Sequence, residues 1–151
     1  MTPAAAPHKT RPIPPFTLTP ADEEMLFSCA RYQYMTVEHW VRHFEDEGKR
    51  RYLQRRSQAL SDNDYLIRLY ITPLGGRGKG QNIFTHGSAG RKFAQSVGKR
   101  VPKRFRPIDV KTLNPRHLAH SADLTDVLLS FDLLARRDDR ITIAEAPASA
   151  A

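Results

Sequence analysis

Arginine and glutamine gather between residues 49 and 60 of this 151-residue chain. The segment holds five basic residues and no acidic residue, so its net charge is +5. A guanidinium matches the edge of guanine or a phosphate, and a carboxamide matches the edge of adenine. The side chains that could make such contacts are Lys49, Arg50, Arg51, Gln54, Arg55 and Gln58. These residue types favour contact with double-stranded DNA.

A second basic region spans residues 72–107, which hold nine basic residues and no acidic residue. Near its start, Arg77 and Lys79 lie within a glycine-rich stretch, and we expect them to reach a DNA backbone or minor groove beside the main contact. Residues 20–48 carry a net charge of −5, and the whole chain carries +8. Charge separated in this way is typical of a surface that meets phosphates.

The alternative interpretation of residues 49–60 is an ordinary solvated helix face. The apolar positions of this predicted helix are few: Tyr52, Leu53, Ala59 and Leu60. A helix that is merely soluble usually carries acidic residues three or four positions from its basic ones. Residues 49–60 have none, which favours the binding interpretation.

The residues for other kinds of chemistry are few, and we expect no enzyme, metal site or small-molecule cofactor. The single cysteine, Cys29, excludes a disulfide scaffold and a multi-cysteine zinc site. An acidic group at residues 138–145 lacks the following lysine of a nuclease cluster. Two histidine sets have ligand-like spacing, but one helix rarely supplies a whole metal site. These sets are His39 with His43, and His117 with His120 and Asp123.

The elements that must position the basic residues follow from capping signals and from hydrophobic periodicity. In chain order, these signals predict a helix from Thr19-Pro20 to residues 31–33, a helix from Thr36 to Gly48, a helix over 49–60, strands over 65–71 and 81–85, a helix over 88–97 and a helix over 114–137. Helix, helix, basic helix and hairpin follow one another in the order of a winged helix-turn-helix, whose recognition helix enters the major groove.

The predicted fold class is therefore mainly α with a small β hairpin (α+β), a winged helix-turn-helix followed by a long C-terminal helix. The domain boundaries are a disordered Pro/Ala-rich tail over 1–16, the winged helix over 17–98, a basic linker over 99–113, the long helix over 114–137, and a short strand at 141–144 within a tail over 138–151.

Several short motifs resemble those of a known family. They are Leu18-Thr19-Pro20, Tyr34-Met35-Thr36-Val37-Glu38-His39, the pairs Arg50-Arg51 and Arg55-Arg56, Phe84-Thr85-His86-Gly87-Ser88-Ala89-Gly90, and His120 with Asp126 and Val127. Over residues 17–135 the chain resembles the N-terminal part of the replication-relaxation family of winged-helix proteins. It is also similar to multiple-antibiotic-resistance-type and phenolic-acid-regulator-type repressors. His86 and Gly87 depart from this family's pattern, which has Leu and Thr there.

The resemblance implies sequence-specific binding of double-stranded DNA, in the control of transcription or of replication on bacterial plasmids or mobile elements. Members of the family are commonly longer, with a further domain after the long helix. Two other interpretations stay open. One is a protein-interaction adaptor whose acidic first two helices bind a basic partner. The other is a truncated, nuclease-like replication-relaxation protein.

The long helix predicted at 114–137 carries more apolar surface than packing against one small domain requires. Its apolar residues are Leu118, Leu124, Val127, Leu128, Phe131, Leu134 and Ala135. We therefore expect a homodimer that places two recognition helices on a palindromic site. The chain has no apolar run near the roughly 20 residues of a membrane span, and no secretory signal in its first 15 residues. We expect a cytoplasmic, nucleoid-associated protein.

Overall fold

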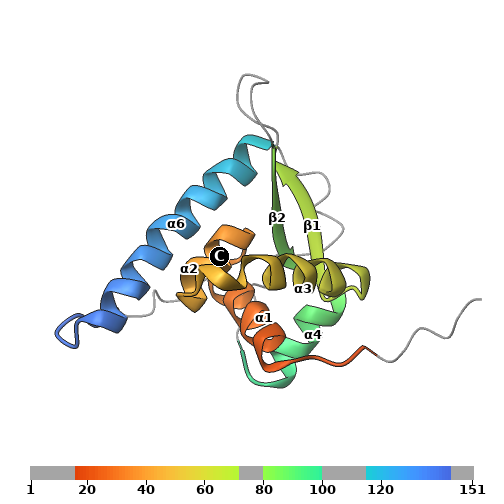
Figure 1. Ribbon diagram of the computed structural model, residues 1–151, viewed down its shortest axis with the longest axis horizontal. Coiled ribbons are helices and arrows are strands. Elements are labelled where there is room, and N and C mark those ends of the chain that lie inside the picture. The colour runs from red at the N-terminus through yellow and green to blue at the C-terminus, as the bar shows by residue number, and fades with distance from the viewer. Residues whose placement is uncertain (1–15, 72–79, 100–114, 144–151) are drawn as a thin grey trace, which may run out of the picture.

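The computed structural model describes residues 16–71, 80–99 and 115–143. The elements, shown in Figure 1, are α1 (Pro20–Tyr32), α2 (Val37–Phe44), a short 3-10 helix η1 (Glu47–Lys49), α3 (Arg50–Asp62), β1 (Leu66–Ile71), β2 (Gln81–His86), α4 (Ser88–Ser96) and α6 (Pro115–Arg137). The described part is mostly helical with one antiparallel hairpin. This confirms the predicted α+β class, with a long helix following the hairpin.

The first two helices begin where the capping signals predict. The Thr19 hydroxyl accepts from the Asp22 N–H at 3.2 Å, and the Asp22 carboxylate accepts from the Thr19 N–H at 2.9 Å. Thr36 and His39 form the same reciprocal arrangement at the start of α2, with the imidazole Nδ1 in place of a carboxylate oxygen. Each box satisfies backbone donors that a helix start leaves free.

The end of α2 differs from the prediction. The helix stops at Phe44, not at Gly48, and Glu45 follows it with a left-handed φ of 52°. The Asp46 carboxylate then accepts from the Gly48 N–H at 3.0 Å and caps η1. A short side chain that bonds the backbone in this way competes with helix continuation. As a result Lys49 belongs to η1 and precedes α3.

The hairpin pairs β1 with β2 in an antiparallel register from Leu66↔His86 to Ile71↔Gln81. Two backbone hydrogen bonds join it to the segment between α1 and α2. The Met35 N–H donates to the Phe84 carbonyl at 2.9 Å, and the Phe84 N–H donates to the Met35 carbonyl at 2.7 Å. The sheet is thereby tied to the turn between α1 and α2.

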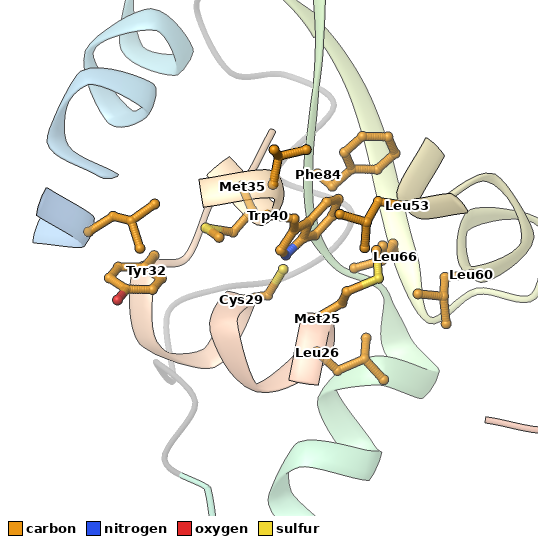
Figure 2. Close-up of a cluster of buried hydrophobic side chains, with 12 residues drawn as sticks. Met25, Leu26, Cys29, Tyr32, Met35, Trp40, Leu53, Leu60, Leu66 and Phe84 are labelled. Atoms are coloured by element: carbon orange, nitrogen blue, oxygen red, sulfur yellow. The ribbon is translucent and has the colours of Figure 1, made fainter. Parts of the chain in front are cut away.

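The central core lies where α1, α2, α3 and β2 meet, around Trp40 (Figure 2). Trp40 is fully buried, and its ring centroid lies 5.3 Å from that of Phe84. Its indole N–H donates to the Ser28 hydroxyl at 2.8 Å. From α3, Leu53 and Leu60 enter this core with no exposed area, which fixes the rotation of that helix.

Helix α4 packs closely against the start of the hairpin. A Cβ added to Gly90 would come within 2.0 Å of the Tyr65 carbonyl oxygen, so only glycine fits this approach. Gly98, just beyond the end of α4, has a φ of +79°, which glycine adopts at little cost.

Helix α6 runs along one side of the molecule, from the end of the hairpin past α2 (Figure 1). Its N-terminal part covers the sheet through Leu118, and Leu129 enters the central core. The strand predicted at 141–144 is wrong over residues 141–143, which have no strand structure. Residues 141–143 follow the end of α6, which lies away from β1 and β2. No described strand is therefore close enough to pair with these residues.

Several predictions fall on residues 1–15, 72–79, 100–114 and 144–151, which lie outside the described residues. They include the N-terminal tail, the glycine-rich turn and most of the basic linker. No helix among the described residues is long and apolar enough to cross a membrane.

Candidate nucleic-acid interface

The outward face of α3 carries four polar side chains in one row. Leu53 and Leu60 occupy the inward face, so positions 51, 54, 55 and 58, spaced three and four apart, point together to solvent. The residues there are Arg51, Gln54, Arg55 and Gln58, and all four are exposed. Together they line one shallow concavity. The structure thus brings together four of the eight residues that the sequence predicts for binding.

Arg50 is held by an acidic partner on the preceding helix. Its Nε lies 2.7 Å from one oxygen of Glu38 and its second guanidinium nitrogen 2.9 Å from the other. These hydrogen bonds lower the pKa of the Glu38 carboxyl and raise the pKa of Arg50. The basic run has no acid of its own, but α2 supplies one. Arg50 therefore anchors the start of α3 to α2.

The other predicted residues lie elsewhere. Lys49 is in η1, with its ammonium 5.2 Å from the centre of the Phe44 ring in a cation–π contact, and it does not line the concavity. Arg77 and Lys79 lie outside the described residues.

The Gln58 carboxamide is oriented by two neighbours. Its NH2 donates to Asp62 at 2.9 Å, and its oxygen accepts from the guanidinium of Arg68 on β1. This second contact brings a strand arginine to the edge of the α3 row. A carboxamide held in one orientation presents its remaining donor and acceptor positions without first losing rotamer freedom.

A groove beside the α3 row extends the polar surface onto the hairpin. Three residues that the sequence interpretation missed line it together with Gln54 and Gln58: Arg68, Gln81 and Asn82. A signal for Arg68 was present. Ile67, Leu69 and Ile71 alternate on the face toward α6, which leaves position 68 on the opposite face.

Arg56 lies in the same basic run but points inward. Its guanidinium bonds both oxygens of Asp22, which is fully buried, with the Nε at 2.8 Å. These hydrogen bonds raise the pKa of Arg56. The pair fastens α3 to the first turn of α1 and so maintains the outward aim of the neighbouring Arg55.

His39 and His43 each contact a carboxylate, and Cys29 is buried. The Nε2 of the buried His39 lies 2.7 Å from Asp126, and the Nε2 of His43 lies 2.8 Å from Glu24. Burial raises the pKa of the Cys29 thiol, which makes it a poor nucleophile. Within residues 16–71, 80–99 and 115–143, no three histidine, cysteine or acidic side chains gather as metal ligands would.

Comparison of the chain with models of protein families, with curated proteins and with solved structures gives no match.

Proposed function

We propose that the protein binds double-stranded DNA with the outward face of α3 in the major groove. The observation that carries this proposal is the row of Arg51, Gln54, Arg55 and Gln58, all exposed on one side of a helix whose other side is buried in the core. Arginine and glutamine are the side chains that pair bidentately with guanine and adenine in that groove.

The dimensions of α3 suit this role. Its 13 residues form a rod of about 20 Å at about 1.5 Å per residue. The major groove is about 12 Å wide and admits one α-helix. The row spans two helical turns, which is enough to reach several consecutive base pairs.

The hairpin adds a second contact area beside the helix. Arg68, Gln81 and Asn82 continue the polar surface from α3 onto the strands that lead to the glycine-rich turn. In the proposed complex, these side chains approach the sugar-phosphate backbone next to the groove that α3 occupies. Such contacts fix the register of the protein on DNA, and the base contacts of α3 supply sequence preference.

This function needs no bond-making chemistry and no cofactor. A regulator of transcription or of plasmid and mobile-element replication, located at the nucleoid, fits both this surface and the family that the sequence motifs resemble.

The test compares two charge-matched double variants. Arg51→Ala/Arg55→Ala removes two positive charges from the α3 row. Lys92→Ala/Arg140→Ala removes two exposed charges from α4 and from the segment after α6. Binding to fluorescent random-sequence and selected duplexes is measured by anisotropy over a series of salt concentrations.

We expect the α3 variant to bind at least tenfold more weakly, because a good arginine–base pair contributes about 1–3 kcal/mol. Each phosphate that the variant no longer neutralises lowers the salt slope by about one unit. The control should stay within about twofold of the wild type, since its two charges lie off the interface. An equal weakening in the two variants would contradict the assignment of α3. A folded wild type without affinity for duplex DNA at low salt would favour the adaptor interpretation instead.

A further inference from the structure

Besides the side that packs on the core, helix α6 has a second apolar side, which faces away from the rest of the protein. Among the described residues, seven large hydrophobic side chains are exposed, and five of them lie on α6. Each of the five is about half exposed, between 48% and 55%: Leu124, Val127, Leu128, Phe131 and Leu134. The concentration of these side chains on one helix sets this surface apart from scattered exposed apolar residues, which are normal in folded proteins.

Polar contacts hold the inner side of the middle of α6. Asp126 accepts from Arg42 at 3.1 Å and pairs with the buried His39 at 2.7 Å. Ser130, which is exposed at the edge between this side and the outward apolar side, accepts from Arg42 at 2.7 Å. The Thr125 hydroxyl donates to a main-chain carbonyl after α1 at 2.7 Å.

The C-terminal half of α6 is held in the same manner. Asp132 accepts two hydrogen bonds from Arg31, at 2.7 and 2.6 Å, and a third from the Tyr32 hydroxyl. Arg136 donates to the main-chain carbonyl of His43 at 2.7 Å. These bonds fix the rotation of α6 about its axis. The five exposed apolar side chains of α6, which we call the apolar stripe, are thereby kept facing outward.

The spacing of the stripe is that of a coiled-coil seam. Leu124, Val127, Phe131 and Leu134 are separated by three, four and three positions, as the a and d positions of a heptad are. Leu128 flanks the seam and widens it on one side. An apolar seam with this repeat fits a second α-helix of the same pattern.

The charges beside the seam select a direction for that partner helix. In an antiparallel pair of α6 helices, Leu124 packs against Leu134 of the second copy and Val127 against its Phe131. This register sets Asp123 beside Arg137 of the second copy, and the two-fold axis repeats the pair. Asp123 is exposed and the Arg137 side chain is 73% exposed, with one bond to Glu45 at 3.2 Å, so both remain reachable.

A parallel pair lacks this complementarity. It would set Asp123 beside the apolar Leu128, and His117 and His120 would each face their own equivalents. Opposite charges at the flanks of a helix pair set its orientation, so the antiparallel register is favoured.

We propose that two copies of the protein associate through an antiparallel pair of α6 helices, with Ser130 next to the two-fold axis. The occupant of the stripe is thus a second copy of this chain. This inference stands on α6 alone and does not depend on DNA binding, so all of its tests are done without DNA.

The first test is a charge exchange, with the dimer dissociation constant measured by sedimentation equilibrium. Asp123→Arg and Arg137→Asp should each weaken the dimer about fivefold, because each variant sets two like charges together in two places. The double variant restores the opposite charges with their signs reversed and should return to within about twofold of the wild type. Circular dichroism checks that each variant is folded. A monomeric wild type, or a double variant weaker than both single variants, would overturn the proposal.

The second test maps the register with a short bismaleimide cross-linker. Ser130→Cys lies near the proposed two-fold axis and should give cross-linked dimer in high yield. Leu134→Cys lies far from its equivalent in the antiparallel pair but beside it in a parallel pair, so it should give little. The wild type is the blank, because its one cysteine, Cys29, is buried. Cross-linking of Leu134→Cys in preference to Ser130→Cys would contradict the antiparallel arrangement.

Discussion

Two neighbouring arginines on α3 have opposite surroundings. Arg55 is exposed in the proposed DNA-binding row, and Arg56 is turned inward onto the fully buried carboxylate of Asp22. A carboxylate without exposed area depends on its partner, because removal of the partner leaves an uncompensated buried charge. The two positions therefore separate binding from stability within one dipeptide.

Arg56→Ala should lower the free energy of unfolding by about 3 kcal/mol, the cost typical of breaking a buried ion pair from one side. Arg55→Ala should change it by less than about 0.5 kcal/mol, as substitutions of exposed residues usually do. Urea denaturation monitored by Trp40 fluorescence measures both. Similar stabilities for the two variants would show that the Asp22 carboxylate does not depend on Arg56.

Among the elements, α2 and α6 meet at a junction that includes one buried histidine, His39. The Thr36 N–H donates to Nδ1 of His39 at 2.9 Å, which requires that this nitrogen carry no proton. The proton on Nε2 then points to Asp126 of α6. Burial lowers the pKa of His39, and this effect outweighs the opposing attraction of Asp126, with Arg42 lowering the pKa further and Glu38 raising it. Neutral imidazole thus caps one helix and holds another.

The stability of the protein should fall as the pH drops below about 6.5, the ordinary value for histidine. The unfolded chain takes up a proton there, whereas the folded His39 does not until its lower pKa is reached, so acid favours unfolding over that interval. His86, whose pKa burial also lowers, acts in the same direction. Each histidine contributes a slope of up to about 1.4 kcal/mol per pH unit.

Urea unfolding between pH 5 and 7.5 measures this slope. His39→Gln should flatten it, and His117→Asn, at an exposed position of α6, should leave it unchanged. A wild type whose stability does not change over this range would contradict the neutral state of the two buried histidines.

At the scale of the whole molecule, the two proposals together determine the symmetry of the DNA target. Two copies joined through α6 present two α3 rows related by a two-fold axis. A two-fold symmetric protein reads two half-sites in inverted orientation. The two proposals together thus predict an inverted repeat as the target of the dimer and a single half-site as the target of one copy.

Selection from a random pool of duplexes should enrich an inverted repeat with the wild type. Phe131→Asp places a charge in the α6 seam, and the same selection should then yield a single half-site, bound more weakly. An asymmetric site enriched by the wild type would show that DNA binding by α3 and dimerisation through α6 do not hold together. An inverted repeat that Phe131→Asp still enriches would instead contradict the role of α6 alone.

Features that depend on near neighbours in the chain were predictable. The Thr19 and Thr36 caps join residues three positions apart, and the start of each helix follows from them. Strand composition predicted β1 and β2, and the long apolar repeat predicted α6. The end of α2 could not be found in the same way, because the Asp46 side chain bonds the Gly48 N–H and so competes with continuation of the helix that the apolar pattern predicts.

For the candidate interface, the order of residues is enough to place basic and amide side chains on the third helix. Which of these side chains face solvent depends on the tertiary contacts of the helix. Arg50 bonds Glu38, 12 positions away, and Arg56 bonds Asp22, 34 positions away. Arg68 joins the surface because β1 pairs with β2 in the hairpin. Likewise, composition placed an apolar stripe on α6, but its outward direction follows from contacts such as His39 with Asp126, 87 positions apart. Local signals record the type of each element. The direction of a helix face depends on partners distant in the chain, which the order of residues does not reveal.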